Sequence, residues 1–170
     1  LIELFSRSNA GLPRLSLNVL AYIYIAIPLA IGCAVSLMYS IELIIILVLI
    51  WIYDIGAYFT GKHFGKHKLF ERISPKKTWE GVIGGTVLCL TVAPVIPNYF
   101  INFSLENWLV IAALVSIFGT LGDLVESMLK RSVDIKDSGT LLPGHGGILD
   151  RFDSFIFSIP FVAVYILLFA

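Results

Sequence analysis

Five long apolar stretches constrain the fold of this chain more than any other feature of its sequence. They cover residues 18–39, 41–59, 82–99, 109–129 and 152–170. About 20 apolar residues suffice for a helix to cross the hydrocarbon core of a bilayer. Backbone polar groups inside lipid need hydrogen-bond partners within the protein, which favours helices. We therefore predict an all-α fold, a polytopic bundle of about five transmembrane helices with membrane lipid around it.

Composition and charge agree with a membrane protein. Of the 170 residues, 58% are hydrophobic and 14% are charged, whereas soluble domains average about half and about a quarter. The 12 basic and 12 acidic side chains cancel. A nucleic-acid-binding surface would require an excess of positive charge, so we expect no nucleic-acid partner.

The positions of the basic residues fit a topology of five spans. If the spans alternate in direction, all 12 lysines and arginines fall on one side, which the positive-inside rule makes cytoplasmic. The turn at residues 98–107, on the other side, contains no lysine or arginine. Two polar loops, one before the third span and one before the fifth, are therefore expected to face the cytoplasm.

Acidic side chains near the ends of the spans are candidate functional residues, because charge within a membrane is costly and is usually retained for function. Asp123, Glu126 and Lys130 share one helix face by their spacing. Gly119 and Gly122 precede them and permit the close approach of a helix or a ligand. The alternative is a helix end that reaches the headgroups, with Glu126 and Lys130 as an ordinary ion pair.

The loop at residues 130–153 alternates cations suited to phosphate with carboxylates suited to Mg²⁺, which prefers oxygen ligands. Glycines on both sides of His145 leave the main chain open to a bulky anion. Asp150 and Asp153 lie three residues apart where the fifth helix begins, and so share one face. Helix capping is the alternative explanation for these aspartates, but it does not explain the neighbouring glycines and basic residues.

A second candidate anion site lies in residues 74–81, just before the third span. Lys76 and Lys77 can neutralise phosphates, Thr78 can hydrogen-bond them, and Glu80 can bind a metal or orient a lysine. Main-chain N–H groups at the start of the third helix would add to this site. The alternative is a loop that anchors the protein at the membrane surface. The same explanation covers four preceding basic residues, Lys62, Lys66, Lys68 and Arg72.

Other residues in the spans have open or simpler interpretations. Asp54, in the second span, either binds metal or nucleotide or pairs with a neighbouring lysine. Gly81 and Gly85 have the GxxxG spacing that is typical of closely packed helices. Cys33 and Cys89 lack the spacing of a zinc site or a disulfide framework, so we expect two small buried side chains.

Together these segments resemble the signature of the phosphatidate cytidylyltransferase (CDP-diacylglycerol synthase) family. The resemblance rests on residues 127–131 (SMLKR), 136–139 (KDSG) and 142–153 (LPGHGGILDRFD), with residues 74–81 (SPKKTWEG) as a second segment. It implies a nucleotidyltransferase of phospholipid biosynthesis, which joins CTP and phosphatidate to give CDP-diacylglycerol and pyrophosphate. It also implies a single membrane-embedded cytidylyltransferase domain over residues 1–170, the C-terminal portion of a longer chain with additional N-terminal spans.

The resemblance carries further expectations about cofactors, partners and location. We expect Mg²⁺, as one or two divalent ions, with room for a monovalent cation. The substrates would be CTP from water and phosphatidate from the membrane lipid, and a homodimer is implied. The active site would face the cytoplasm, at the inner membrane if the protein is bacterial.

Residue roles follow from the resemblance together with the chemistry of each side chain. Asp123 and Asp150 are expected to hold the catalytic cation, with Glu126, Asp153 and Asp54 as further or surrounding ligands. Lipid phosphate or pyrophosphate is expected to bind four basic side chains, Lys130, Arg131, Lys136 and His145. The CTP triphosphate is expected to bind Lys76, Lys77 and Thr78. Further substrate contacts are expected at Ser127, Asp137, Gly146, Gly147 and Arg151.

Three other functions are compatible with parts of the pattern. A CTP-dependent polyprenol or phytol kinase would transfer only the terminal phosphate, but the intact signature favours the cytidylyltransferase. An ion-coupled transporter would use Asp54, Asp123 and Glu126 as coupling sites, but such transporters are often built from inverted repeats, and we find none in this sequence. A scaffolding membrane protein would not need acidic and basic clusters on one side.

Overall fold

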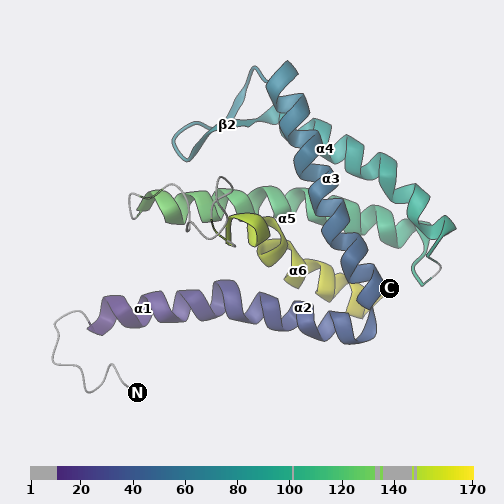
Figure 1. Cartoon of the computed structure of the whole chain (residues 1–170), viewed down its shortest axis with the longest axis horizontal. Coiled ribbons are helices and arrows are strands. Elements are labelled where there is room, and N and C mark those ends of the chain that lie inside the picture. The colour runs from purple at the N-terminus through teal and green to yellow at the C-terminus, as the bar shows by residue number, and fades with distance from the viewer. Residues whose placement is uncertain (1–10, 101, 133–134, 136–146, 148) are drawn as a thin grey trace.

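The computed structural model describes residues 11–100, 102–132, 135, 147 and 149–170, and most of these residues are helical (Figure 1). The chain begins with a continuous helical rod made of α1 (Gly11–Ala21), the π-helical turn η2 (Tyr22–Ala26) and α2 (Ile27–Met38). It continues through α3 (Ser40–Phe64), α4 (Trp79–Val92), the 3₁₀ helix η3 (Ala93–Asn98), α5 (Leu105–Ser132) and α6 (Leu149–Phe169). Between α3 and α4 lies a short antiparallel hairpin, formed by β1 (Lys68–Phe70) and β2 (Ser74–Thr78).

Five helical segments within the described residues are long and apolar enough to cross a membrane, which confirms the predicted all-α, multi-pass architecture. They are Asn18–Met38, Ser40–Phe64, Trp79–Asn98, Leu105–Ser132 and Leu149–Phe169. Several helices extend past the apolar stretches and into charged sequence. This is expected, because a helix that has left the hydrocarbon region can carry charged side chains. The hairpin is the element that the sequence did not predict.

Local sequence explains how the third span begins and ends. Thr78 is the N-cap of α4, and its Oγ1 accepts a hydrogen bond from the backbone N–H of Gly81 at 3.2 Å. Such a cap satisfies one of the N–H groups that have no partner inside the helix. At the other end, Pro94 and Pro97 lie within the 3₁₀ helix η3, since proline cannot donate the hydrogen bonds of a continuing α-helix.

Glycines let two pairs of helices approach closely; the GxxxG spacing predicted this for Gly85, whereas for Gly122 the sequence left open whether a helix or a ligand approaches. A Cβ atom on Gly85 would lie only 2.8 Å from the carbonyl oxygen of Tyr53, so α4 packs backbone to backbone on α3. A Cβ atom on Gly122 would lie 2.7 Å from the carbonyl oxygen of Asp153, so α5 packs in the same way on α6. These two contacts fix the positions of polar residues near the ends of all four helices.

The buried core lies between α3, α4, α5 and α6, and it includes Trp108, Ile46 and Ile159. Large apolar side chains on the outer helix faces are exposed, as expected for surfaces in contact with lipid. Cys89 is buried as predicted, whereas the prediction for Cys33 is wrong, because this cysteine is exposed on α2. The buried residues of α2 are Pro28, Gly32 and Val35, so only one narrow face of this helix is covered.

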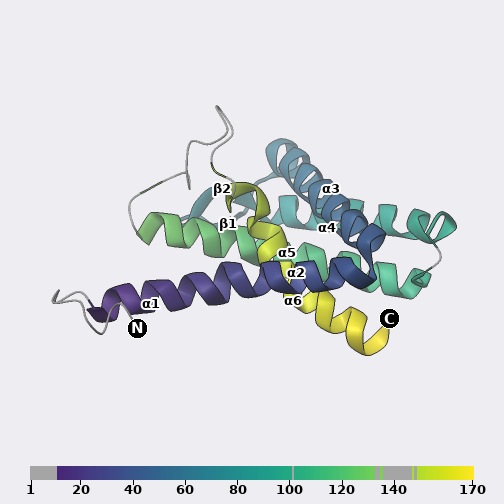
Figure 2. The ribbon, with the colours of Figure 1, turned by 60° about the horizontal axis from the view of Figure 1, so that its bottom comes forward.

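Figures 1 and 2 show the hairpin at the ends of α3 and α4, on the side of the bundle where α5 ends and α6 begins. The hairpin segment at residues 74–78, the C-terminal end of α5 and the start of α6 therefore lie at the same end of the bundle. The turn between η3 and α5 lies at the other end.

Candidate functional site

A cavity of about 630 Å³, lined by charged and hydroxyl side chains among apolar surface, lies at this end of the bundle. Its lining comes from α3, the hairpin, the first turn of α4, α5 and the first turns of α6. The charged residues of the lining are Asp54, Lys62, Lys68, Lys76, Lys77, Asp123, Asp150 and Asp153. Tyrosine and hydroxyl side chains also line it, namely Tyr53, Tyr58, Ser74, Thr78, Thr120 and Ser154. The cavity thus combines cations that suit phosphate with carboxylates that suit a metal ion.

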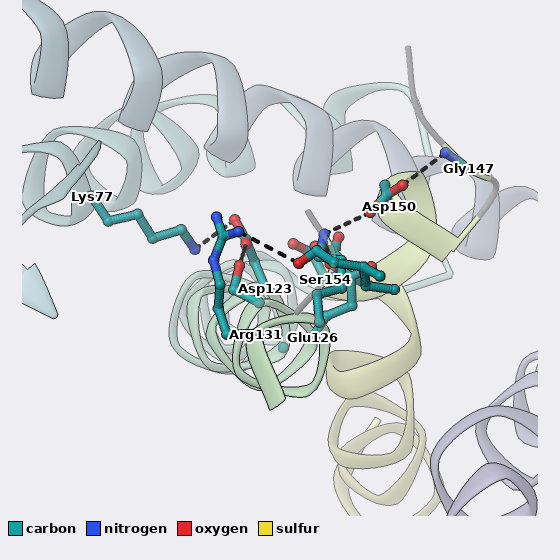
Figure 3. Close-up of polar contacts among 12 residues, drawn as sticks. Lys77, Asp123, Glu126, Arg131, Gly147, Asp150 and Ser154 are labelled. Atoms are coloured by element: carbon teal, nitrogen blue, oxygen red, sulfur yellow. Dashed lines mark hydrogen bonds and ion pairs between the residues drawn. The ribbon is translucent and has the colours of Figure 1, made fainter. Parts of the chain in front are cut away.

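Lys77 joins the hairpin to α5 across this cavity (Figure 3). Its Nζ lies 2.6 Å from Oδ2 of Asp123 and donates a longer hydrogen bond, of 3.5 Å, to the carbonyl oxygen of Thr120. Ser127 donates a hydrogen bond of 3.2 Å to Oδ1 of the same aspartate. The Lys77 and Asp123 side chains remain 23% and 35% exposed, so both are accessible from the cavity.

Thr78 lies where α3 and α4 cross. A Cβ atom on Gly61 would lie 3.0 Å from Thr78 Oγ1, so glycine at this position of α3 lets the threonine pack closely against the helix. Thr78 is buried and lines the cavity, so the N-terminus of α4 lies beside the predicted phosphate-binding segment. Backbone N–H groups and the dipole at a helix N-terminus favour anions.

Lys130 occupies a different position from the one expected of a residue that binds substrate. Its Nζ lies 2.6 Å from Oε2 of Glu126 and 2.6 Å from Oδ1 of Asp150. The side chains of Lys130, Glu126 and Asp150 are 16%, 2% and 13% exposed. Lys130 does not belong to the cavity lining. The Glu126–Lys130 ion pair considered in the sequence is therefore present, and Asp150 extends it to α6.

Asp150 also stabilises the entry to α6. Its Oδ2 accepts a hydrogen bond of 2.7 Å from the backbone N–H of Gly147 (Figure 3). A carboxylate in the first turn of a helix that reaches back to a preceding N–H group resembles one half of a capping box. The capping explanation therefore holds for Asp150, and the same side chain also lines the cavity.

Asp153 and Asp54 also line the cavity, and neither forms a close ion pair with a lysine of the described residues. Asp153 is buried, and its Oδ1 accepts a hydrogen bond of 2.6 Å from the backbone N–H of Ser154. Asp54 is exposed, and we find no hydrogen bond or ion pair to it within the described part of the chain. Pairing with a neighbouring lysine, one of its two interpretations, is thus not observed there. Its role in binding metal or nucleotide stays a prediction.

The described acidic, histidine and cysteine side chains do not form a complete metal site by themselves. Across residues 11–100, 102–132 and 149–170, no three acidic, histidine or cysteine side chains lie close enough to form a metal site by themselves. Glu126 Oε1 is buried and has no hydrogen-bond donor among the described residues. The aspartates in the cavity therefore supply oxygen ligands, but not a complete coordination shell.

Several predicted residues lie elsewhere. Arg131 and Arg151 are exposed and are not part of the cavity lining, and Arg131 donates a hydrogen bond of 3.4 Å to the carbonyl oxygen of Ile135. Glu80 pairs with His67 at 2.6 Å, and no lysine of the described part of the chain pairs with it. Four further predictions lie outside the described residues, namely Lys136, Asp137, His145 and Gly146.

The structure also adds residues that the sequence analysis missed or explained otherwise. Tyr53 forms a short hydrogen bond with Thr120 between α3 and α5, and both line the cavity. Tyr58 and Lys62 line it from α3. The spacing offered a signal, because both follow Asp54 at intervals of four residues and so lie on the same helix face.

These observations define a class, a multi-pass membrane protein with a cavity at one end of its helix bundle that is lined by both lysines and aspartates. The chain belongs to the cytidylyltransferase family, which it matches over residues 1–169. It is 52% identical over 117 residues to the phosphatidate cytidylyltransferase of Staphylococcus haemolyticus and 51% identical over 118 residues to that of Staphylococcus aureus. It is also 52% identical over 129 residues to the phosphatidate cytidylyltransferase of Bacillus subtilis.

These matches cover much of this chain but only part of each relative. They include 68% of this chain and 45% of the relative for both staphylococcal proteins, and 72% and 46% for the protein of Bacillus subtilis. The chain therefore spans about half the length of the curated relatives that it matches.

Proposed function

We propose that this chain carries the catalytic site of a phosphatidate cytidylyltransferase, which joins CTP and phosphatidate to give CDP-diacylglycerol and pyrophosphate. The observation that carries the proposal is the cavity, where the hairpin lysines face the aspartates of α5 and α6 at one end of a membrane-spanning bundle. Family membership and the names of the relatives support the same reaction.

The reaction needs positioning and charge neutralisation more than it needs a strong base. The phosphate monoester of phosphatidate has a second pKa of about 6 and is therefore largely dianionic at neutral pH. One of its oxygens attacks the α-phosphorus of CTP, the bond between the α- and β-phosphates breaks, and pyrophosphate leaves with the electron pair. The main obstacle is that two polyanions must meet, so fixed positive groups lower the barrier.

The hairpin residues are suited to bind the triphosphate. Lys76 and Lys77 line the cavity, and Thr78 places the N-terminus of α4 beside them. Lys77 already faces a carboxylate, Asp123, so it is held toward the cavity before any nucleotide arrives. The sequence predicted that Lys130 binds lipid phosphate or pyrophosphate. Because Lys130 contacts Asp150 and Glu126 and does not line the cavity, we propose that it positions these two carboxylates.

We further propose that Asp123 and Asp150 would hold a divalent cation, Mg²⁺. Mg²⁺ is usually held by one or two carboxylates together with substrate phosphates and water. The oxygen ligands in the cavity fit such a site, which the phosphates of the nucleotide would complete. When bound, the cation would neutralise charge on the triphosphate and on the departing pyrophosphate. Asp54 and Asp153 line the same cavity and are the candidates for additional ligands.

The orientation in the membrane is also a proposal. The hairpin and the C-terminal end of α5 carry most of the described lysines and arginines, which the positive-inside rule assigns to the cytoplasm. CTP would then enter from the cytoplasm while phosphatidate remains in the facing leaflet. The homodimer and the bacterial inner-membrane location implied by the resemblance stay predictions.

Labelled CTP tests the reaction. Full-length protein with phosphatidate and Mg²⁺ is expected to transfer label from the α-phosphate and the cytidine into lipid, and to release the γ-label as pyrophosphate. Removal of divalent ions by a chelator is expected to abolish turnover, and added Mg²⁺ to restore it. Transfer of the γ-label into lipid, with no cytidine, would instead indicate a lipid kinase and refute the proposal.

A further inference from the structure

The two lysines of β2 lie in an irregular part of the hairpin. Lys68 is the partner of Thr78, and Phe70 is the partner of Ser74. One residue of β1 therefore faces the three residues 75–77 of β2, which include both lysines. A bulge of this kind turns side chains in a new direction but leaves its extra residues outside the regular ladder of hydrogen bonds. Strand pairing alone therefore does not fix where these lysines point.

The base of the hairpin is fastened by Glu80, in the first turn of α4. Its Oε1 lies 2.6 Å from Nδ1 of His67, the residue just before β1. The backbone N–H of His67 also donates hydrogen bonds of 3.2 Å to both carboxylate oxygens of Glu80. In return, the carbonyl oxygen of His67 accepts a hydrogen bond of 3.0 Å from the backbone N–H of Trp79. These contacts join the two ends of the hairpin.

This arrangement differs from an ordinary helix cap. The N-cap of α4 is Thr78, and a carboxylate in the first turn of a helix commonly bonds the N–H group of its own N-cap residue. Glu80 bonds His67 instead, 13 positions earlier in the chain. The helix dipole would favour a negative charge at Glu80 without any partner. The contact with His67 therefore has a consequence of its own, which is to close the hairpin.

Glu80 and His67 are not part of the cavity lining. Their side chains are 26% and 78% exposed. The other hold on the hairpin within the described residues is the ion pair of Lys77 with Asp123, at 2.6 Å. A phosphate that binds Lys77 competes with Asp123 for the same ammonium group. When that pair loosens, the contact at the base of the hairpin is what still keeps the bulge in place.

We propose that Glu80 and His67 are positioning residues, which clamp the base of the hairpin and so hold Lys76 and Lys77 toward the triphosphate of CTP. This inference rests on the proposed function, because it takes CTP as the ligand of the hairpin lysines. Groups that are already ordered bind a ligand more tightly than mobile ones, since less conformational entropy is lost on binding. The clamp is therefore expected to set the affinity for CTP and not the affinity for the lipid. Glu80 would orient lysines, one of the two roles open to it, through the backbone of the hairpin.

Equilibrium binding of CTP with Mg²⁺ to the full-length protein tests the clamp. Glu80→Ala removes all three contacts to His67 and is expected to weaken CTP binding about three- to tenfold. His67→Ala removes only the exposed imidazole contact, so a loss of about two- to threefold is expected. His67→Asn places an amide N–H group near the position of Nδ1 and is expected to restore most of that loss. The KM for phosphatidate is expected to stay within about twofold of the wild type in all three variants.

A double variant tests whether the two residues act as one unit. His67→Ala/Glu80→Ala is expected to bind CTP as Glu80→Ala does, because the imidazole has no partner left to lose. Additive losses would mean that the two side chains act separately and would overturn the inference. The Mg²⁺ concentration for half-maximal CTP binding is expected to stay unchanged. A rise in that concentration in Glu80→Ala alone would make Glu80 a metal ligand and would overturn the inference as well.

His63→Ala is the matched control. His63 is an exposed histidine four positions before His67, its Nδ1 lies 2.8 Å from the carbonyl oxygen of Phe59 in the same helix, and it does not line the cavity. CTP binding by this variant is expected to match the wild type. Equal losses in His63→Ala and His67→Ala, or no loss in Glu80→Ala, would overturn the clamp. So would a lower melting temperature of Glu80→Ala with equal loss of affinity for both substrates, because that pattern indicates a purely structural contact.

The fate of the label separates this inference from the proposed function. CTP binding that weakens in Glu80→Ala, in a protein that transfers only the γ-phosphate to lipid, would support the clamp and refute the reaction. Formation of lipid-linked cytidine by the wild type, with an unchanged KM for CTP in Glu80→Ala, would support the reaction and refute the clamp.

Discussion

The acidic residues of the site differ in their neighbours, and the neighbours indicate what each can do. Asp123 pairs with Lys77 in a partly exposed position, and such pairs typically contribute only about 0–1 kcal/mol to stability. Asp150 pairs with Lys130, which is largely buried together with Glu126. Removing one partner of a buried pair is far more costly. We therefore assign a substrate- or metal-binding role first to Asp123 and a combined structural role to Asp150.

Asp123→Asn is expected to lower turnover at least about a hundredfold, because it removes a proposed metal ligand. The free energy of unfolding is expected to change by less than about 1 kcal/mol, since the pair with Lys77 is partly exposed. Assays of lipid-linked cytidine and thermal melting in detergent measure the two effects.

The double variant Lys77→Asp/Asp123→Lys is the control for this prediction. It restores an ion pair between the hairpin and α5 but puts each charge on the wrong side of the cavity. It is expected to melt close to the wild type and to remain inactive. Recovery of turnover in this variant would show that the pair serves only to hold the hairpin in place.

Helix contacts position these side chains, and the contact of α5 with α6 is the most sensitive. In Gly122→Ala the new Cβ would lie 2.6 Å from the Cβ of Phe157 and 2.7 Å from the carbonyl oxygen of Asp153. The helices would have to separate, at a cost typical of overpacked cores, about 1–3 kcal/mol. We expect a lower melting temperature together with reduced turnover, because Asp153 moves with α6.

Gly119→Ala provides a matched control one turn earlier on α5. Its new Cβ would lie 3.6 Å from the Cβ of Ser154, an ordinary contact distance. This variant is expected to match the wild type in both melting temperature and turnover. Equal damage from the two substitutions would mean that helix flexibility, not the close contact at Gly122, explains the effect.

The helices could be predicted from sequence because each apolar stretch is long enough to specify a span by itself. The hairpin could not, because β1 and β2 are only three and five residues long and are held by pairing with each other. Lys62 and Lys68 were explained as anchoring residues, because a basic residue next to a predicted span does not reveal whether its side chain turns toward a cavity. Lys130 was assigned to substrate because the sequence does not show that Asp150, on α6, joins Glu126, on α5, as a second carboxylate partner of this lysine.

At the scale of the whole molecule, the arrangement of charge predicts how the bundle lies in the membrane. Cys33 and Cys89 would first be replaced, and single cysteines introduced as Arg72→Cys in the hairpin loop or Glu106→Cys in the first turn of α5. A membrane-impermeant maleimide is expected to label the cysteine at position 106 in intact cells. It is expected to label the one at position 72 only after the membrane is permeabilised. The reverse pattern would mean that the cavity opens away from the cytoplasm.

In the proposed enzyme, two segments far apart in the sequence form one nucleotide site. A photoreactive CTP analogue, cross-linked to the full-length protein with Mg²⁺ and mapped by mass spectrometry, tests this directly. We expect labelled peptides both from residues 74–81 and from the end of α5 or the start of α6, all suppressed by excess CTP. Label confined to one of these segments, or found outside both, would contradict it.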